Sequence, residues 1–486
     1  MPTGTIGILG GGLGGLSAAY YLKRDKPDQP VSLVDSNDYA GGWIRSWADK
    51  DSGVVTELGP RTIRGRGETA NNTFGLIKEL DIDDLVRTVG PDASARYIYA
   101  KGDTHVLPSG ALRALFAVNT PFTRPLGYYV LRECFLTNGG AEVCADDDHE
   151  EESAYDFFHR RFGPEMADYL ISPLMCGICG GDAKTISVKF MFRHLYEAER
   201  KHGSVAVGLL KETLAGRKKR GKDVDGQSGL TAAQPPPVYY LDGGLQRLTR
   251  ILHLRAESLG ASVQLNTECV ELHLCNKGGG ATAVLSNGKT LECEHVVSTI
   301  PARRLAEVLV GHDGLAKLLS SVPTATIATT NLSYDDPDAL APYKGFGVLA
   351  APSEGLSLLG ITFDNCVYGR RDRVDLTVMM GGHAFDKHFG GDPALTSEES
   401  LTVTAVDHVR RVLGVRALPD RYGSRVLYDC IPQYTVGHYG RVTQMKDYIF
   451  QNRLPLTLAG SSYAGVSIND VIFASLKAAK RLLRKS

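Results

Sequence analysis

The chain opens with a glycine-rich turn that is compatible with very few folds. Residues 9–16 read LGGGLGGL, with Gly10, Gly12 and Gly15 in the order G-x-G-x-x-G, after an apolar strand and at the start of an alanine-rich helix. In this order the first glycine permits a tight turn, the second lets backbone approach a pyrophosphate, and the third lets the helix pack closely on the strand. The phosphates then lie at the positive end of the helix. The turn therefore predicts a βαβ dinucleotide-binding fold.

The next strand ends in Asp35, twenty-five residues after Gly10. An acidic side chain here accepts hydrogen bonds from both ribose hydroxyls and repels a 2′-phosphate, which disfavours NADP. A second glycine turn, GGWIRS, follows at 41–46, and ELGPRTIR stands at 57–64. An extended FAD needs such a turn with a downstream arginine as it crosses toward its isoalloxazine, whereas a nicotinamide dehydrogenase gives no reason for it. FAD is therefore the predicted cofactor.

The C-terminal stretch LAGSSYAGVSIND has the same order of strand, glycine turn and helix. An apolar run over 454–459 stops at Gly460, and a helical pattern begins near 466–469. The N-terminus of that helix offers unpaired N–H groups and about half a positive charge. Directed at the pyrimidine edge of a flavin, it would stabilise the negative charge that develops on reduction. The alternative is an ordinary C-terminal helix that only packs against the rest of the chain.

Size and composition limit the other possibilities. The 486 residues are too many for one simple core, so two or three interleaved domains are expected. A net charge of −1 gives no overall attraction to nucleic acid. The nine cysteines are scattered, which favours a reducing compartment, and no secretory leader is expected. The single C-x-x-C, Cys176 with Cys179, lacks a second pair for zinc, so no metal is predicted.

The segment at 107–131 is the strongest candidate for contact with a membrane. Arg113 and Arg124 would each cost about 2.5–3.5 kcal/mol at the centre of a bilayer, so a spanning helix is not expected. Apolar and aromatic residues with basic flanks are typical of segments that lie in the interface, and the alternative is a helical hairpin that covers a core. The apolar set consists of Leu112, Leu115, Phe116, Phe122, Leu126, Tyr128, Tyr129 and Leu131.

Seven motifs together resemble the protoporphyrinogen oxidase family, within the amine oxidase and phytoene desaturase-like superfamily. They are GGGLGGL, GGWIRS, ELGPRTIR, YLDGGLQRL, VVSTIPA, YDCIPQYTVGHY and LAGSSYAGVSIND, and they run nearly from end to end. The resemblance implies a six-electron, FAD-dependent oxidation of protoporphyrinogen IX to protoporphyrin IX in haem synthesis. Molecular oxygen would be the acceptor and hydrogen peroxide the product.

The same resemblance implies a location and partners. It implies a monotopic protein on the membrane surface, in eukaryotes other than plants on the intermembrane-space side of the mitochondrial inner membrane. Ferrochelatase and a second copy of the chain, as a homodimer, are further candidate partners.

The predicted fold class is α/β. A Rossmann-like FAD-binding domain is assembled from 1–90, 240–300 and 440–486, and an α+β substrate-binding domain is inserted at 301–439. A mainly helical domain at 91–210 would bind the membrane and admit substrate. Charge, glycine and proline leave 146–152 and 216–237 with too little apolar surface to fold, so both are expected to be disordered or inserted.

The resemblance also assigns functional residues to the matching positions. Arg61 takes the catalytic position beside the flavin, and Arg96 takes that of an arginine that holds a substrate propionate. Gly177, Phe346, Leu349 and Met379 match the wall of the substrate pocket. The cofactor contacts fall on Gly10, Gly11, Gly12, Leu13, Gly14, Gly15, Asp35, Ser36, Gly42, Trp43, Gly59, Pro60, Arg61, Thr62, Val270, Tyr439, Val466, Ser467 and Ile468.

Other functions remain open at this point. A related branch uses coproporphyrinogen III, which differs in its number of propionates, and a flavin amine oxidase or carotenoid desaturase would share the scaffold. Amine oxidases usually attach FAD through a cysteine near the C-terminal motif, and LAGSSYAG has none. The non-enzymatic alternative is a flavin- or porphyrin-binding scaffold, which the intact glycine turns and Arg96 disfavour.

Overall fold

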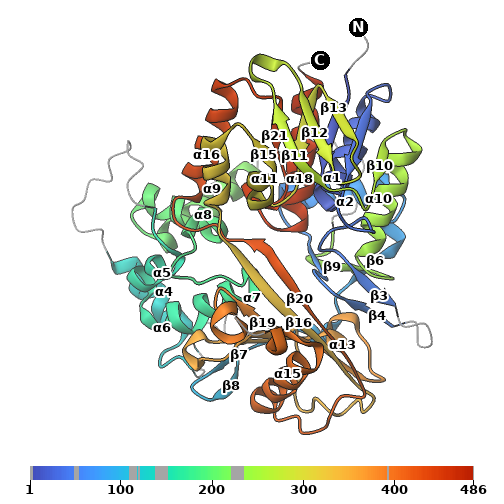
Figure 1. Cartoon of the computed structure of the whole chain (residues 1–486). Coiled ribbons are helices and arrows are strands. Elements are labelled where there is room, and N and C mark those ends of the chain that lie inside the picture. Colours follow the sequence, from blue (N-terminus) through green and yellow to red (C-terminus); the bar gives the residue numbers. More distant parts are fainter. Residues whose placement is uncertain are drawn as a thin grey trace. The chain divides into compact units, whose positions relative to one another are not determined.

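The computed structural model (Figure 1) describes residues 4–48, 54–108, 116, 118, 121–136, 151–220, 235–390 and 393–484. The chain divides into two compact units, each built from segments distant in sequence. Unit 1 consists of 1–88, 233–323 and 438–486, and unit 2 of 89–232 and 324–437. Of the expected insertion at 146–152, all but the last two residues lie outside the described residues.

The centre of unit 1 is a parallel sheet in the order β10-β2-β1-β14-β21. Its strands are β10 (Ser262–Gln264), β2 (Val31–Val34), β1 (Ile6–Leu9), β14 (His295–Ser298) and β21 (Leu456–Leu458). The first two strands in sequence are fully buried, as strands covered on both faces must be. Because β1 and β21 both pair with β14, the two ends of the chain meet in one sheet.

Helices cover one face of this sheet. One apolar core joins β1 and β2 with α1 (Leu13–Asp25), α2 (Glu68–Glu79), α10 (Gln246–Ser258) and α18 (Ile468–Leu483). The first and last helices are in direct contact, because the Ser475 hydroxyl donates to the carbonyl oxygen of Gly14 at 2.8 Å. The predicted α/β fold class, with its Rossmann-like layer assembled from distant segments, is confirmed.

A second sheet covers the other face, in the order β13-β12-β11-β15. It comprises β13 (Thr290–Cys293), β12 (Ala281–Leu285), β11 (Cys269–Leu274) and β15 (Leu309–Val310), and α11 (Ala302–Val308), α12 (Asp313–Ser320) and α16 (His438–Gln451) pack with it. Leu305 and Leu315 are buried in this core. Residues 301–323 therefore belong to unit 1, and their assignment to the substrate-binding domain was wrong.

Short strands complete unit 1. One pair is β3 (Ser46–Ala48) with β4 (Val55–Glu57), and a three-stranded sheet contains β5 (Ile63–Arg64), β9 (Val238–Leu241) and β6 (Val86–Thr88).

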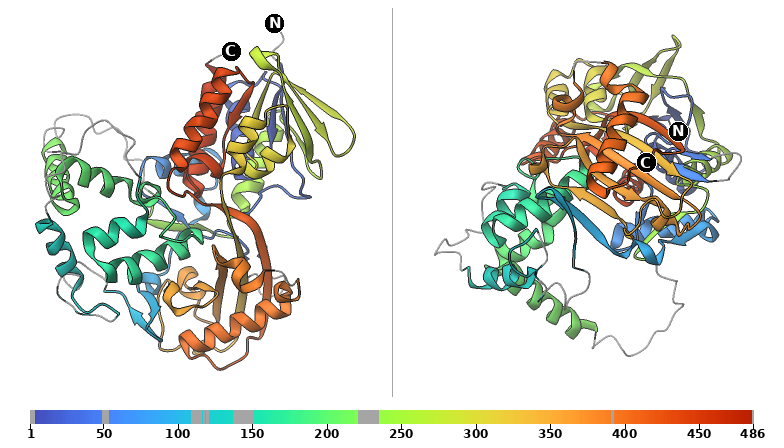
Figure 2. Two further views of the ribbon diagram at one scale, coloured as in Figure 1. Left: turned by 60° about the vertical axis from the view of Figure 1, so that its left-hand side comes forward. Right: turned by 90° about the horizontal axis from the view of Figure 1, so that it is seen from below.

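Unit 2 contains a seven-stranded sheet in the order β20-β16-β19-β18-β17-β7-β8. The strands are β20 (Arg421–Pro432), β16 (Thr324–Tyr334), β19 (Val374–Gly382), β18 (Leu358–Phe363), β17 (Gly347–Ala350), β7 (Arg96–Ala100) and β8 (Asp103–Val106). Figure 2 shows α15 (Glu398–Leu413) lying across one face, where it buries Leu401, Ala405 and Val409. Since β7 and β8 belong to this sheet, the expectation of one mainly helical domain over 91–210 was wrong at its start.

The helices of unit 2 include α4 (Leu126–Phe135), α5 (Ala154–Phe162), α7 (Ser172–Cys179), α8 (Val188–His202) and α9 (Val205–Arg220). Because α9 continues to Arg220, the first residues of the expected insertion at 216–237 are helical. At its other end, the Gly65 N–H donates to the carbonyl oxygen of Pro237 at 2.9 Å. The prediction of disorder was therefore wrong at both ends, and 221–234 lie outside the described residues.

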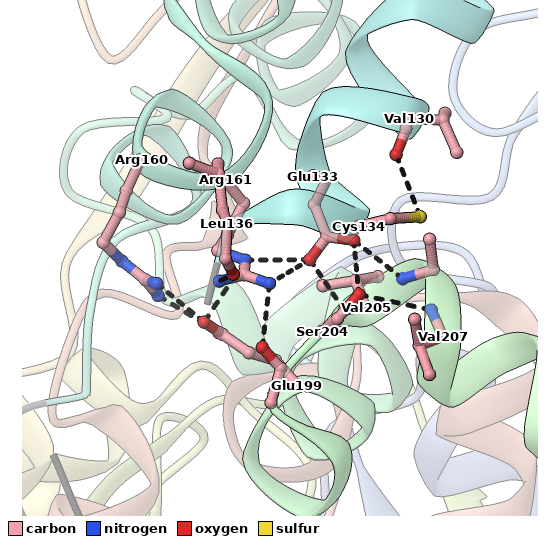
Figure 3. Close-up of polar contacts among 12 residues, drawn as sticks. Val130, Glu133, Cys134, Leu136, Arg160, Arg161, Glu199, Ser204, Val205 and Val207 are labelled. Atoms are coloured by element: carbon pink, nitrogen blue, oxygen red, sulfur yellow. Dashed lines mark hydrogen bonds and ion pairs between the residues drawn. The ribbon is translucent and has the colours of Figure 1, made fainter. Parts of the chain in front are cut away.

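A buried charge cluster joins four of these helices (Figure 3). The Glu133 carboxylate of α4 is fully buried and accepts from the Arg161 guanidinium of α5 and from the first N–H groups of α9, Val205 at 2.8 Å and Ala206 at 3.0 Å. The second carboxylate, Glu199 of α8, accepts from Arg160 at 2.6 Å. A side chain of α4 thus caps the N-terminus of α9 and fixes the two helices together.

The Glu133 carboxylate stays ionised although it is buried. Burial by itself would raise its pKa, but the N–H groups of Ala206 and Val205, the Ser204 hydroxyl and Arg161 outweigh that effect and hold the pKa below its ordinary value. The cluster is therefore a structural ion pair that helps define the helical part of unit 2. Over the described part of the chain, no helix is long and apolar enough to cross a membrane.

Candidate functional site

The turn after β1 has the geometry that its three glycines predict. Gly10 has a φ of 103°, a conformation that residues with side chains rarely adopt. A Cβ atom added at Gly15 would lie 1.8 Å from the carbonyl oxygen of Gly10, so only glycine lets α1 start this close to β1. A Cβ atom at Gly12 would meet nothing nearer than the Cα of Gly42, at 3.7 Å. Gly10 and Gly15 are thus required by the protein itself, whereas Gly12 leaves open space beside it.

The N-terminus of α1 is suited to an anion. Among the residues that the structure describes, no side chain caps this helix end, and its first turn holds no acidic residue. The first backbone N–H groups of a helix lack intrahelical acceptors and carry a partial positive charge. A pyrophosphate would satisfy these groups, which is the role that the sequence predicts for this turn.

The second glycine turn lies directly against the first. The Gly41 N–H donates to the carbonyl oxygen of Gly11 at 2.8 Å, and Gly12 and Gly41 form an isolated bridge. Gly59 approaches the same turn, because its added Cβ would lie 2.1 Å from the carbonyl oxygen of Trp43. Three segments that the sequence assigned to the cofactor, around Gly12, Gly42 and Gly59, are therefore adjacent in unit 1.

Asp35 is positioned by backbone on both sides. One carboxylate oxygen accepts the Gly11 N–H at 2.5 Å, and the other accepts the Asn37 backbone N–H at 2.7 Å. The Thr267 N–H donates to the carbonyl oxygen of Asp35 at 2.8 Å, which brings the start of β11 to this point. Val270 lies at a β-bulge in that strand and is exposed. The Asn37 side-chain amide also donates to the Asp35 carboxylate at 2.8 Å, which leaves about one of its four lone-pair sites for a ribose hydroxyl. Ser36 beside it is exposed.

The C-terminal element also lies where the sequence places it. After Gly460 come α17 (Ser461–Ala464), Gly465 with a φ of 138°, and α18, whose first residue is Ile468. Ser467 caps α18: its hydroxyl accepts from the Asp470 N–H at 3.2 Å and donates to the Asp470 carboxylate at 2.6 Å. This helix end is thus partly neutralised, unlike that of α1, and its predicted action on a flavin stays a prediction.

Asn469 connects this helix to the ELGPRTIR motif. Its side-chain amide donates to the carbonyl oxygen of Arg64 at 2.7 Å, while its buried amide oxygen has no donor among the described residues. Arg61 in the same motif is buried, with Pro60 exposed beside it, and Tyr439 is half-buried in the first turn of α16. The catalytic role of Arg61 and the cofactor contacts of Thr62, Val466 and Tyr439 stay predictions.

Sequence reasoning missed the polar residues that hold the glycine turns in place. The buried Glu57 carboxylate accepts from the Ser46 hydroxyl at 2.7 Å and from the Leu245 N–H at 2.7 Å. It ties the GGWIRS turn to the YLDGGLQRL motif. The Thr299 hydroxyl donates to the carbonyl oxygen of Leu9 at 2.9 Å, at the end of β1. Glu57 and Thr299 both stand inside quoted motifs, so the signal was present but no role was given to it.

Unit 2 brings the predicted pocket-wall residues into one area. A Cβ atom added at Gly177, in α7, would lie 2.2 Å from a methyl carbon of Leu349. Leu349 pairs with Gly360, and Gly360 pairs with Met379, so the two side chains share a face of the sheet. The Arg96 guanidinium lies 5.7 Å from the ring centre of Phe346. Arg96 begins β7, and its side chain is exposed.

The C-x-x-C pair is buried in α7. Burial raises the pKa of Cys176 to about 12 and that of Cys179 to about 11, so both thiols stay protonated and unreactive at neutral pH. Within the described ranges, no group of three potential metal ligands occurs.

The sequence and the fold of this chain are similar to those of known flavoproteins. Residues 13–483 match the family of flavin containing amine oxidoreductases. Protoporphyrinogen oxidase from Homo sapiens is 34% identical over 487 residues, covering 99% of this chain and 98% of that protein, and the Bos taurus enzyme is 35% identical over 488 residues with the same coverage. The structure of a putative protoporphyrinogen oxidase from Exiguobacterium sp. superposes with a TM-score of 0.79 at 21% identity, covering 100% of both chains.

The chain therefore belongs to the flavin-containing amine oxidoreductases, in their protoporphyrinogen oxidase branch. It is an oxidoreductase, and FAD is its cofactor. The residues present fit that cofactor: the uncapped N-terminus of α1 would hold the pyrophosphate, the space beside Gly12 would admit it, and Asp35 would bind the ribose. When bound, FAD supplies the acceptor for a hydride.

Proposed function

We propose that this protein oxidises protoporphyrinogen IX to protoporphyrin IX, with molecular oxygen as the final acceptor and hydrogen peroxide as the product. The observation that carries the proposal is near full-length identity of 34% to human protoporphyrinogen oxidase. The glycine cradle of unit 1 and the apolar face of unit 2 are consistent with it.

The reaction requires mainly that the protein position the substrate. Each two-electron step removes a hydride from a methylene bridge of the macrocycle and a proton from a pyrrole nitrogen. No nucleophile is required, so orientation of the substrate is the principal contribution of the protein. A tetrapyrrole is flat and mostly apolar, and it needs apolar walls with cations only where its carboxylates lie. Leu349, Met379 and Phe346 would supply such walls, and Arg96 such a cation.

The test is an anaerobic and then aerobic assay of the purified holoprotein. Protoporphyrinogen IX added without oxygen should bleach the yellow flavin absorbance, and admission of air should restore it with the appearance of porphyrin fluorescence and peroxide. Coproporphyrinogen III and a set of primary amines are run in parallel. Faster turnover of coproporphyrinogen or of an amine would replace the proposed substrate, and a flavin that no substrate bleaches would leave only a scaffold.

Contact with a membrane surface is a second part of the proposal. On α4, the exposed apolar side chains are Tyr128, Val130, Leu131 and Phe135, the last two 62% and 83% exposed, and α9 adds exposed Leu210 and Leu214. The Glu133 cluster fixes these two helices together. Phe122 and Tyr129 are buried, so the predicted apolar set of 107–131 is only partly available to lipid. Most of 109–120 lies outside the described residues.

A matched pair of variants tests this surface. Phe135→Glu with Leu131→Glu should abolish co-sedimentation with liposomes, because exposed apolar side chains favour the interface and carboxylates do not. Phe450→Glu is the control, since Phe450 of α16 is 76% exposed in unit 1. Equal binding by all three proteins would remove α4 from the proposal.

The expected location is the intermembrane-space side of the mitochondrial inner membrane, and this expectation rests on the family resemblance. Contacts with ferrochelatase and with a second copy of the chain rest on the same ground. Protease protection in intact and in osmotically opened mitochondria would test the location.

A further inference from the structure

The sheet face of unit 2 that carries Leu349 and Met379 continues past them into polar residues. Cross-strand pairing runs from Leu349 through Gly360 and Met379 to Thr329 and then to Arg425. Partners in an antiparallel ladder point to the same face of a sheet. These residues therefore form one row that crosses β17, β18, β19, β16 and β20. The row changes from apolar at one end to a hydroxyl and a cation at the other.

The opposite face of the same strands is accounted for separately. Thr330 and Ser424, the neighbours of Thr329 and Arg425, hydrogen-bond to each other at 2.7 Å, and Thr402 of α15 contacts Ser424 at 3.0 Å. They therefore point toward α15. Thr329 and Arg425 consequently point away from α15, toward the face that carries Met379.

The polar end of the row has hydrogen-bonding capacity that the protein does not use. Thr329 is 6% exposed, and its buried hydroxyl has no partner among the described residues. A buried hydroxyl without a partner costs about 1–3 kcal/mol, so it usually indicates an unseen partner. Its position beside Met379 places it at the edge of the predicted substrate wall.

Arg425 also lacks a partner. It is half-buried on β20, and within the described part of the chain its guanidinium forms no ion pair or hydrogen bond. By contrast Arg421, on the same strand and the same face, is paired with Asp335. Two residues along β16 from Thr329, the Asn331 amide oxygen lies 2.7 Å from the Thr377 hydroxyl, which it shares with the Asp364 carboxylate at 2.5 Å. The amide N–H groups of Asn331 remain as donors. A guanidinium, a hydroxyl and an amide thus lie on one face of the sheet, and the buried Asp364 carboxylate next to Thr377 is an acceptor beside the amide.

We propose that Thr329, Asn331 and Arg425 form a carboxylate-binding site at the polar end of this row, on the substrate face of unit 2. The inference rests on the proposed function, because the carboxylate is that of a tetrapyrrole. An unpaired arginine with neutral donors beside it is the arrangement that binds carboxylates through charge-assisted hydrogen bonds.

The distance between this carboxylate-binding site and Arg96 determines which tetrapyrroles can contact both. Arg96 starts β7 and Arg425 lies on β20, five strand spacings away, which is about 24 Å between backbones at about 4.8 Å per spacing. The two propionates of protoporphyrin IX are on neighbouring pyrroles, so one molecule held by Arg96 cannot also reach Arg425. Coproporphyrin III carries a propionate on every pyrrole and presents carboxylates on opposite sides. The proposed site at Arg425 therefore binds a carboxylate of tetrapyrroles that carry four carboxylates.

Equilibrium binding to the holoprotein tests this assignment. The probes are protoporphyrin IX, coproporphyrin III and coproporphyrin III tetramethyl ester, followed by porphyrin fluorescence. Arg425→Gln should weaken coproporphyrin III about tenfold, the loss of one charge-assisted hydrogen bond, and leave protoporphyrin IX and the ester unchanged. Arg421→Gln is the control on the same strand and should change none of the three.

Thr329→Val gives a second, isosteric measurement. It should weaken coproporphyrin III severalfold and raise the thermal midpoint of the free holoprotein, because the substitution removes an unpartnered buried hydroxyl. Unchanged coproporphyrin affinity in Arg425→Gln, or equal weakening of the acid and the ester, would overturn the assignment while protoporphyrinogen turnover kept the proposed function intact. A wild-type holoprotein that neither binds porphyrins nor oxidises protoporphyrinogen would refute both.

Discussion

The two candidate sites are built from different parts of the polypeptide. In unit 1 the cofactor cradle is made of backbone brought together by glycines, as where Gly15 meets the carbonyl oxygen of Gly10 and Gly59 meets that of Trp43. In unit 2 the substrate face is made of side chains presented by a regular sheet, such as Leu349 and Met379. At Gly15 and Gly59 the backbone leaves no room for an added atom, whereas side-chain recognition can be altered one group at a time. Substitutions should therefore act as all-or-none changes in unit 1 and as graded changes in unit 2.

The largest effect is expected at Gly15. In Gly15→Ala the new Cβ would lie 1.8 Å from a carbonyl oxygen, so α1 has to separate from β1 and the cradle is lost. We expect no bound flavin and a collapse of the thermal midpoint. Gly75→Ala is the control, because Gly75 is also helical, in α2, and its added Cβ meets nothing within 4 Å. The Gly75→Ala control should gain about 0.5–1 kcal/mol of stability. A Gly15→Ala protein that retained its flavin would contradict the all-or-none behaviour expected of unit 1.

Gly12→Val separates the cofactor from the fold. The protein has space for an added Cβ at Gly12, with its nearest contact at 3.7 Å, so the variant should fold with a nearly unchanged circular dichroism spectrum. The side chain would occupy the approach of the pyrophosphate, and FAD should not survive gel filtration. Stoichiometric FAD in this variant would show that the phosphates lie elsewhere.

Unit 2 should be most sensitive at its buried charges. Glu133→Gln removes the anion with which the buried Arg161 guanidinium makes its closest contact, leaving it only the longer pair with Glu199 at 3.4 Å, and it removes the charge that caps α9. Breaking a buried pair in this way costs about 3–5 kcal/mol, measured as a shift in the urea midpoint. Glu197→Gln removes an ion pair with Arg193 that is 64% exposed on both sides, and it should cost less than about 0.5 kcal/mol. Similar losses in the two variants would mean that the Glu133 cluster is not holding the helices.

Acid should destabilise both units through one buried histidine each. Burial lowers the pKa of His408, which lies against Ser357 in unit 2, and that of His438 in unit 1, each to about 4. Protonation then favours the unfolded chain, so the contribution of each neutral histidine is complete above pH 6.5 and is lost as the pH falls toward 4. At pH 4.5 the loss is about 2.5 kcal/mol for each histidine.

Denaturation curves between pH 7.5 and 4.5 would measure this loss. His408→Gln should flatten the pH dependence of unit 2 and leave that of unit 1, and His438→Gln should do the reverse. Asp407, Arg411 and His388 are the charged groups that act on His408. If one variant flattened both transitions, the two units would unfold together and their comparison would need to be abandoned.

Sequence reasoning worked where the information is local. The G-x-G-x-x-G order, Asp35 at the end of β2 and the start of α18 near Ile468 are each set by a few consecutive residues. It failed where partners are distant. Glu57 binds the Leu245 N–H 188 positions away, and residues 301–323 join unit 1 only because Leu305 and Leu315 complete its core. Alternation predicts that a strand has two faces but not which strand pairs with it, so the row from Leu349 to Arg425 was invisible in the sequence.

The smallest effect is expected at Arg96, where a single exposed side chain is removed from the substrate face. Its guanidinium lies over the Phe346 ring, and beyond the carbonyl of Ser94 at 3.4 Å it remains available to a carboxylate. Arg96→Gln should raise the apparent KM for protoporphyrinogen about tenfold and change kcat little, because the lost interaction orients the ground state and the transition state alike. Arg87→Gln is the control, since Arg87 is exposed and paired with Asp242 in unit 1. A fall in kcat with KM unchanged would place Arg96 at the reacting bond, and unchanged kinetics would show that side chains on this face do not act by graded recognition.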